Sequence, residues 1–324
     1  MKTYQRFNVA LFWYIRKTRY EYLESMVTIG VCVRNCTSTI RRAVESIMAQ
    51  DYPHKLMEVI FVDDGSKDNT LSIINEYVSQ MDMKVKVFHH EWKGLGYSRN
   101  VVVQNACGKY IIWVDGDMIL PKDHVRLQVT FMEKNPEVGI GKAKYGVYST
   151  KNLFAFLENL AAVVEFSSDD WKISDYKPLG TGGSIYRVDA VREVNGFNVK
   201  IKGVGEDMDL EFRVKNAGWL LAVTPALFYE IRRESWKDLW NEYFWHGAGG
   251  KYILKCMTHS QSVLSKMFPP FAILILFKHS ILAYKLTNRK RVFLLPLHWI
   301  FKRAAWLAGF TFSCLKETRI VNKI

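Results

Sequence analysis

The chain has 324 residues, of which 49% are hydrophobic, and its net charge is +13. This length is enough to bury one full core and to leave residues for an appendage. Residues 1–25 and 268–324 contribute +3 and +9, which leaves +1 for the centre. Basic residues concentrated in aromatic-rich flanks favour an anionic membrane surface as a partner and exclude nucleic acid.

The N-terminal 25 residues do not resemble a signal peptide. The apolar run Val9 to Ile15 is short and is followed by Arg16 and Lys17, with no small-residue cleavage site. We expect an interfacial or docking helix here. The five cysteines of the chain are an odd number without a CxxC pair, which predicts reduced, buried thiols in a cytosolic context.

The centre alternates buried-strand runs with helical patterns, which predicts an α/β fold with a mostly parallel sheet. We expect three helices between the strands. The first begins at a cap, Thr37 or Ser38, and runs to Ala49, and the other two cover residues 70–79 and 98–105. Polar clusters fall where the strands end, at the edge where open α/β sheets place their ligands. The expected strands are Val27 to Val33, Val59 to Val62, Val85 to Phe88 and Tyr110 to Val114.

Two strand-end clusters are candidates for chemistry. Asp115 and Asp117 follow a buried strand and can direct oxygen ligands toward one hard cation, which in turn would bind substrate phosphates. A simple turn or helix cap is the competing interpretation of such a pair. Asp63 and Asp64 precede a Gly-Ser turn, so they either form that turn or recognise a nucleotide base.

These residues resemble the family 2 glycosyltransferases, which have a GT-A fold, over about Val27 to Tyr252. The segment 62–68, VDDGSKD, is similar to the family's V-D-D-G-S-x-D signature, and 115–117, DGD, to its D-x-D. Residues 50–53, QDYP, are similar to its Q-x-Y-P connection. At the first strand end only Asn35 matches strongly, because Cys32 stands where the family usually has proline.

The resemblance implies roles for the donor site. Asn35, Asp63 and Asp64 would bind the nucleotide, with Asp64 contacting the base. Arg99, in a segment similar to the one that precedes the family's metal strand, would help to hold the donor. Asp115 and Asp117 would bind Mg2+ or Mn2+ and the diphosphate, with Asp117 as the main contact.

The second half of the chain is expected to supply the acceptor side. Gly182 and Gly183 belong to a Gly-rich segment that lines the acceptor pocket in the family, although a tight turn entering a strand explains it equally well. Residues 205–210, GEDMDL, resemble the family's E-D motif. Inverting transfer needs a base opposite the leaving diphosphate, so we predict Asp207 as that base and Glu206 as its orienting or acceptor-binding neighbour. For Asp209 we prefer a helix-capping electrostatic role.

Residues 244–250, FWHGAGG, resemble an aromatic, Gly-rich segment that covers the donor diphosphate in the family. His246 is a candidate contact to the metal or diphosphate, but packing among aromatic side chains is the favoured interpretation. The Q-x-x-R-W motif of processive synthases is absent from the sequence, which favours addition of a single sugar.

The C-terminal apolar runs are ambiguous about the membrane. Both contain central basic residues, Lys278 in the first and Lys302 with Arg303 in the second, and one central Lys costs about 2.5 to 3.5 kcal/mol on insertion. We therefore expect amphipathic helices lying on the cytoplasmic face of the membrane, with a spanning or re-entrant arrangement second. Packing on the catalytic domain, or a dimer contact, is a third possibility.

The sequence thus predicts three regions: a basic helical extension over 1–25, a GT-A catalytic domain over 26–255, and basic, aromatic-rich membrane-associating helices over 256–324. The expected activity is transfer of one sugar, with inversion, from a nucleotide-diphosphate sugar to a hydroxyl or a lipid phosphate, the acceptor being lipid-linked or a glycan. A polyprenyl-phosphate sugar synthase, a processive polysaccharide synthase and a non-catalytic sugar-nucleotide-binding protein are the alternatives. A nucleotidyltransferase is disfavoured because no glycine lies between Val31 and Thr37. The oligomeric state is not predicted.

Overall fold

The structure, a computed structural model, describes residues 25–165, 179–201, 204–256 and 269–321. The expected N-terminal helix therefore lies outside the described residues. In chain order the elements are β1 (Val27–Val33), α2 (Ile40–Met48), η1 (His54–Leu56), β2 (Met57–Asp64), α3 (Thr70–Val78), β3 (Lys84–His90), α4 (Leu95–Asn105), β4 (Tyr110–Trp113), β5 (Met118–Ile119), α5 (His124–Lys134), β6 (Val138–Tyr145), α6 (Leu153–Glu165), β7 (Ser184–Arg187), α7 (Val188–Glu193), α8 (Glu206–Asn216), β8 (Leu220–Glu230), α9 (Trp236–Cys256), α11 (Pro269–Thr287), η2 (Lys290–Leu294) and α12 (Leu295–Val321).

One sheet runs through the molecule in the order β3-β2-β1-β4-β7-β6-β8-β5. The first four strands are parallel, with β1 between β2 and β4. β7 is antiparallel to both of its neighbours, β6 and β8 are again parallel, and β5 closes the edge antiparallel to β8. All four strands predicted from the sequence are present, and the mostly parallel α/β architecture is confirmed.

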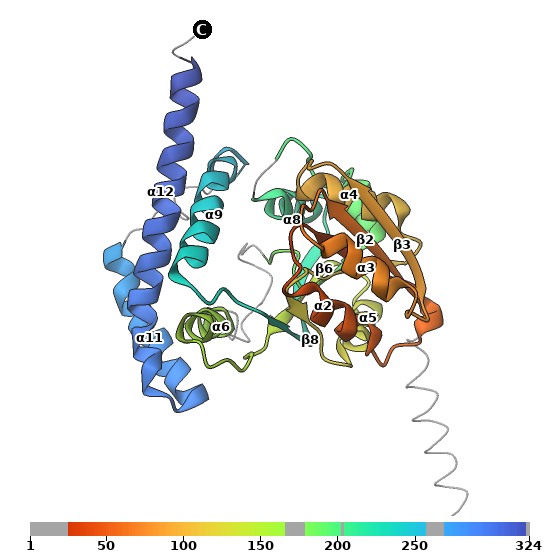
Figure 1. Cartoon of the computed structure of the whole chain (residues 1–324), viewed down its shortest axis with the longest axis horizontal. Coiled ribbons are helices and arrows are strands. Elements are labelled where there is room, and N and C mark those ends of the chain that lie inside the picture. The colour runs from red at the N-terminus through yellow and green to blue at the C-terminus, as the bar shows by residue number, and fades with distance from the viewer. Residues whose placement is uncertain (1–24, 166–178, 202–203, 257–268, 322–324) are drawn as a thin grey trace, which may run out of the picture.

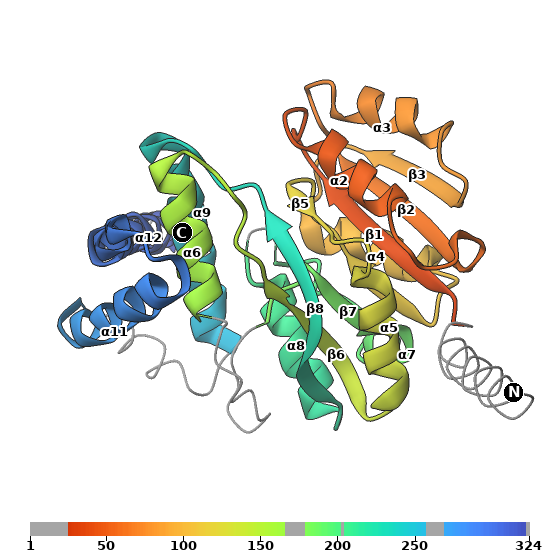
Figure 2. The same ribbon diagram turned by 90° about the horizontal axis from the view of Figure 1, so that it is seen from below.

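Helices cover both faces of this sheet (Figure 2). Alternate residues of β1 and β2 point to opposite sides, as a strand requires. Val59 and Phe61 join a core with α2, α3 and α5 on one face. Ile60 and Val62 join a second core with α4, α7 and α8 on the other. Burial on both faces explains why these strands are continuous apolar runs.

A group of helices, α6, α9, α11 and α12, lies on the β8 side of the sheet (Figures 1 and 2). α12 packs along α9 at very short range, because a Cβ added at Gly247 or at Gly309 would come within 1.9 Å of a backbone carbonyl oxygen of the facing helix. Side chains of α6, α11 and α12 form a third apolar cluster. The C-terminal helices therefore pack on the rest of the protein, and no described helix is both long enough and apolar enough to cross a bilayer.

Two local predictions were wrong. α2 begins at Ile40 after Thr39, and no side chain caps it; the Thr39 hydroxyl donates to the carbonyl of Cys36 at 3.4 Å. The cysteines with described side chains are free thiols, but only Cys32 is buried, and Cys107 is exposed. Cys107 lies in the turn before β4, where hydrophobic periodicity carries no information about burial.

Candidate active site

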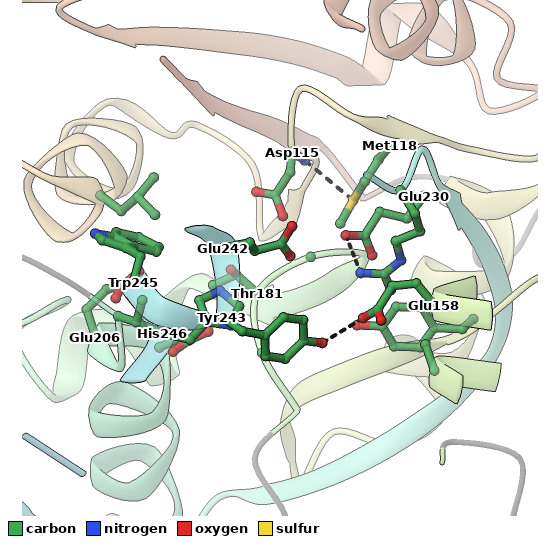
Figure 3. A pocket seen from close by; sticks show the side chains of 18 of the residues that line it. Asp115, Met118, Glu158, Thr181, Glu206, Glu230, Glu242, Tyr243, Trp245 and His246 are labelled. Atoms are coloured by element: carbon green, nitrogen blue, oxygen red, sulfur yellow. Dashed lines mark hydrogen bonds and ion pairs between the residues drawn. The ribbon is translucent and has the colours of Figure 1, made fainter. Parts of the chain in front are cut away.

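A cavity of about 370 Å3 lies between the sheet and the helical group. Asp115, two residues after β4, the turn before β7 and the first turn of α8 form the side toward the sheet. The end of β8 together with α6, α9 and α12 forms the opposite side. Figure 3 shows side chains from these separate segments directed into one space. Of the sequence-predicted site residues, the cavity is lined by Arg99, Asp115, Gly182, Glu206, Asp207 and His246.

A buried ion pair joins two of these residues. Arg99 projects from α4 and is 4% exposed, and its Nη1 donates to Oε1 of Glu206. Nη2 of the same guanidinium lies 4.0 Å from Oδ1 of Asp115. Burial raises the pKa of Glu206 to about 7, although the Arg99 charge opposes that rise. Oε2 of Glu206 is buried without a hydrogen-bond partner, so this oxygen is available to a ligand in the cavity.

Asp207 is the second residue of α8. The helix begins directly after Gly205, whose φ of 110° is readily adopted only by glycine. Oδ1 of Asp207 accepts the backbone N–H of Met208 at 2.8 Å. Its Oδ2 lies 3.7 Å from the point where a Cβ on Gly180 would stand. Asp207 therefore has one oxygen held by the helix and the other directed toward the Gly-rich turn. Asp209, two residues on, instead pairs with Arg213 at 2.7 Å.

The two carboxylates of the D-x-D pair differ in position. Asp115 lines the cavity with its side chain 39% exposed, whereas Asp117 is not among the cavity-lining residues. Burial and, after it, the neighbouring Asp115 charge raise the pKa of Asp117 to about 6. A carboxylate whose charge is disfavoured by burial and by a second carboxylate is chemically suited to share a divalent cation with it.

Among the residues that the structure describes, no group of three or more His, Cys, Asp or Glu side chains is arranged to hold a metal ion. The protein would therefore supply only the Asp115 and Asp117 oxygens to such an ion. Mg2+ normally keeps several waters and binds through one or two carboxylates together with substrate phosphates. The donor set fits a cation that is shared with a bound diphosphate.

The turn at residues 180–183 enters β7, and Gly180 and Gly182 also line the cavity. That this cavity takes the acceptor stays a prediction. A Cβ on Gly182 would lie 2.1 Å from Cε of Met118 and 2.9 Å from Oδ2 of Asp115, and a Cβ on Gly183 would meet the Phe228 ring at 2.5 Å. Gly183 contacts Phe228 and is absent from the cavity lining. The backbone of this turn can approach Asp115 only because Gly182 lacks a side chain.

Two buried charged residues that the sequence did not single out hold this turn. Nζ of Lys142, in β6, donates to the carbonyls of Gly182 and Gly180, the latter at 3.5 Å. Glu211, in α8, accepts the backbone N–H groups of Leu179 at 2.9 Å and Gly180 at 2.7 Å. Burial lowers the pKa of Lys142 to about 8. The sequence offered a hint for Lys142, because a lysine stands inside the small and apolar stretch 138–143.

The predicted nucleotide-binding residues lie at the ends of β1 and β2 and do not line this cavity. The Asp64 carboxylate accepts the backbone N–H groups of Lys93 at 2.7 Å and Gly94 at 3.0 Å. Asp63 accepts from Ser66 and contacts His89 at 2.7 Å. Asn35, with φ 54°, accepts the N–H of Lys67 at 2.8 Å. These contacts shape the turn after β2 and fix the start of α4, which carries Arg99.

His246 and Trp245 line the cavity from α9. The His246 ring lies 5.5 Å from the Tyr243 ring and 5.8 Å from the Trp245 ring, measured between centroids. Burial lowers the pKa of His246, which favours the neutral imidazole. His246 thus both packs among aromatic rings, as expected, and faces the cavity.

A four-residue cluster on the helical side was not predicted. Glu158 of α6 accepts from Tyr243 at 2.6 Å and from Lys302 of α12 at 2.9 Å, and contacts Nε2 of His298 at 2.6 Å. Although burial alone would raise the pKa of Glu158, Lys302 and the hydrogen bond with His298 lower it well below its usual range. Glu158 and Lys302 both line the cavity. A single acid within the apolar run 153–164 was the available sequence hint.

The comparisons with known proteins identify the family of the chain. Residues 28–194 match the family model described as glycosyl transferase family 2. An uncharacterized glycosyltransferase of Rickettsia felis is 32% identical over 112 residues, covering 35% of this chain and 18% of that protein. Glycosyltransferase GlyA of Streptococcus pneumoniae is 24% identical over 265 residues, covering 76% of this chain and 36% of GlyA. The chain thus spans about a fifth to about a third of the length of these relatives.

Among solved structures, the mannosyltransferase PcManGT from Pyrobaculum calidifontis, in complex with GDP-Man and Mn2+, superposes with a TM-score of 0.63. Its sequence identity is 18%, and the match covers 96% of both chains. Because the sequence identity is this low, the similarity is evidence for the fold alone. It supports the GT-A type of α/β fold for this chain.

Proposed function

Because the chain belongs to glycosyl transferase family 2, we propose that it transfers one sugar, with inversion, from a nucleotide-diphosphate sugar to an acceptor bound in the cavity. The observation that carries the proposal is the meeting of Asp115, Glu206 and Asp207 around one space. These three carboxylates come from stretches about ninety residues apart in the sequence. A nucleotide-sugar donor is further supported by GDP-Man in the PcManGT complex.

In this mechanism the donor sugar lies near Asp115 and the Gly182 backbone, and the acceptor lies near Asp207. Asp207 takes the proton from the acceptor hydroxyl as that oxygen attacks the anomeric carbon. The bond between that carbon and the diphosphate oxygen breaks, and its electron pair leaves with the nucleoside diphosphate. Arg99 holds Glu206 in place, and the free Oε2 of Glu206 accepts a hydrogen bond from a substrate hydroxyl.

We propose that Asp115 and Asp117 hold Mg2+ or Mn2+. Such an ion, when bound, stabilises the negative charge that develops on the leaving diphosphate. The Mn2+ in the PcManGT complex supports this choice. Asn35, Asp63 and Asp64 are proposed to lie beside the nucleotide, because they shape the surface at the ends of β1 and β2.

The test is release of nucleoside diphosphate from a panel of nucleotide sugars, measured with Mg2+ or Mn2+ and after treatment with EDTA. We expect release with one donor, loss of that release in EDTA and recovery when the metal is added back. Asp115→Asn should lose activity, while Asp209→Asn, which changes a carboxylate outside the cavity, should keep it. Binding of a nucleotide sugar with no turnover under any condition would instead favour a non-catalytic binding protein.

We also propose that the C-terminal helices rest on the cytoplasmic face of a membrane. Large apolar side chains on α11, η2 and α12 are exposed, among them Phe277, Ile281, Leu297 and Leu315. The sequence from 268 to 324 carries ten Lys and Arg against one acid. An exposed apolar surface within a basic segment matches the chemistry of an anionic lipid interface.

Flotation with vesicles tests the membrane proposal. Binding should be stronger to vesicles that contain an anionic lipid than to purely zwitterionic ones, and Lys278→Glu with Lys285→Glu should weaken it several-fold. Equal recovery with both kinds of vesicle, or no binding to either, contradicts the proposal.

A further inference from the structure

The cavity is richer in carboxylates than in cations. Among the described residues its lining contains six carboxylates against four Lys and Arg. Each of those cations already has a partner inside the protein: Arg99 pairs with Glu206, and Lys142 donates to two backbone carbonyls. Arg232 pairs with Glu230 at 2.8 Å, and Lys302 pairs with Glu158 at 2.9 Å.

This charge pattern bears on the acceptor, which in the proposed mechanism lies beside Asp207. A phosphate monoester carries about −1.5 to −2 charge at neutral pH. To bind here it would have to displace Glu158 or Glu230 from its cation and remain next to the displaced carboxylate, which is electrostatically unfavourable in a partly buried site. A sugar hydroxyl carries no charge and can donate hydrogen bonds to the carboxylates without breaking either ion pair.

The same cavity offers the groups that a sugar ring requires. The Trp245 side chain lines it and is 48% exposed, which leaves part of the indole surface open for stacking. Nε of Arg232 and Oε2 of Glu206 are buried without hydrogen-bond partners, one a donor and the other an acceptor. Figure 3 shows Trp245 and Glu206 toward one end of the cavity, with Tyr243 between them and Glu158.

We propose that the acceptor is a neutral glycan, attacked through a sugar hydroxyl, and that Trp245 is the platform on which its terminal sugar stacks. This inference rests on the proposed sugar transfer. It selects a hydroxyl over a lipid phosphate as the reacting group. A lipid-linked glycan remains compatible, because its sugar end, and not its phosphate, would enter the cavity.

The test offers two kinds of acceptor, a panel of neutral oligosaccharides and a polyprenyl phosphate in detergent micelles. Donor hydrolysis without an acceptor is measured beside transfer. Labelling of an oligosaccharide, with none on the polyprenyl phosphate, is the expected result. Labelling of the polyprenyl phosphate alone, or donor hydrolysis with no labelled oligosaccharide, overturns the inference while leaving the proposed function in place. Absence of any donor turnover removes the proposed function itself.

Substitutions at Trp245 locate the platform. Trp245→Ala should raise the KM for the glycan about tenfold, and Trp245→Phe should restore most of that affinity. The control is Trp236→Ala: Trp236 lies on the same helix, is 45% exposed and packs on Phe154 and Phe301 away from the cavity lining. Equal loss of transfer and donor hydrolysis in Trp245→Ala, or an unchanged KM, would show that the sugar does not stack there.

Discussion

Replacing Asp207 by Asn changes the proposed base without changing its shape. Asn keeps a side-chain oxygen that can accept the N–H of Met208, as Oδ1 of Asp207 does at 2.8 Å, so the first turn of α8 should be preserved. What is lost is the capacity to take a proton from the acceptor hydroxyl. Glu206 cannot replace it readily, because that side chain is 3% exposed and Arg99 holds one of its oxygens.

Loss of a positioned general base typically costs about 100- to 10,000-fold in rate. At about 1.36 kcal/mol for each tenfold change, this corresponds to roughly 3 to 5 kcal/mol of transition-state stabilisation. We therefore expect kcat with a hydroxyl acceptor to fall by that factor, while the KM for the donor changes little. The assay is steady-state release of nucleoside diphosphate at saturating donor, with the melting temperature recorded for each variant.

Asp209→Asn is the matched control, since it removes a carboxylate from the same helix turn but loses only the pair with Arg213. This pair is partly buried and lies outside the cavity lining, so the activity of the variant should stay within about twofold of the wild type. A drop of less than about tenfold in Asp207→Asn would refute the assignment of the base. Equal losses in the two variants would point to damage to α8 and not to chemistry.

Three further changes probe the surroundings of the cavity. Glu158→Ala leaves Lys302 and Tyr243 without their shared acceptor. Urea denaturation should therefore show a loss of about 3 to 5 kcal/mol in the free energy of unfolding. A loss below about 1 kcal/mol would contradict a structural role for the cluster. Burial lowers the pKa of Lys142 from 10.5 to about 8. Between these two pH values Lys142 is protonated in the unfolded chain and has lost its proton in the folded protein. The free energy of unfolding therefore increases as pH rises through this window. Lys142→Met should remove that dependence, so its stability relative to the wild type should decline from pH 8 to pH 10; a constant difference would refute the shift. Gly182→Ala places a Cβ 2.1 Å from Cε of the buried Met118 and 2.9 Å from Oδ2 of Asp115. Displacement of these side chains should lower turnover by about tenfold or more, and unchanged turnover would show that the close approach is not needed.

The fold was largely predictable because its information is local. Apolar runs of four to eight residues bounded by polar clusters determine β1, β2 and β4, and burial on both faces of a sheet requires such runs. Helix starts were less predictable. Thr37 and Ser38 were the predicted capping residues of α2, but the helix begins after Thr39 and no side chain caps it.

The site was predictable in part. Carboxyl ends of neighbouring parallel strands lie at one edge of a sheet, so the position of Asp115 beside the cavity follows from the strand order. Asp63 and Asp64 were expected at the donor, yet their carboxylates are bound by backbone and side-chain groups of the chain itself. A sequence pattern gives the position of a carboxylate along the chain but not the partners that fold around it.

The sequence by itself determined the alternation of strands and helices, the acids at the strand ends and the basic character of the C-terminal flank, since each depends on neighbouring residues. Only the tertiary structure decided that Glu206 neutralises Arg99, 107 residues away, and that Lys302 reaches Glu158 across 144 residues. Such pairs form when packing removes both charges from water, because a buried charge without a partner costs several kcal/mol. Which charges become buried depends on how α9 and α12 dock beside the sheet, and no local pattern encodes that docking.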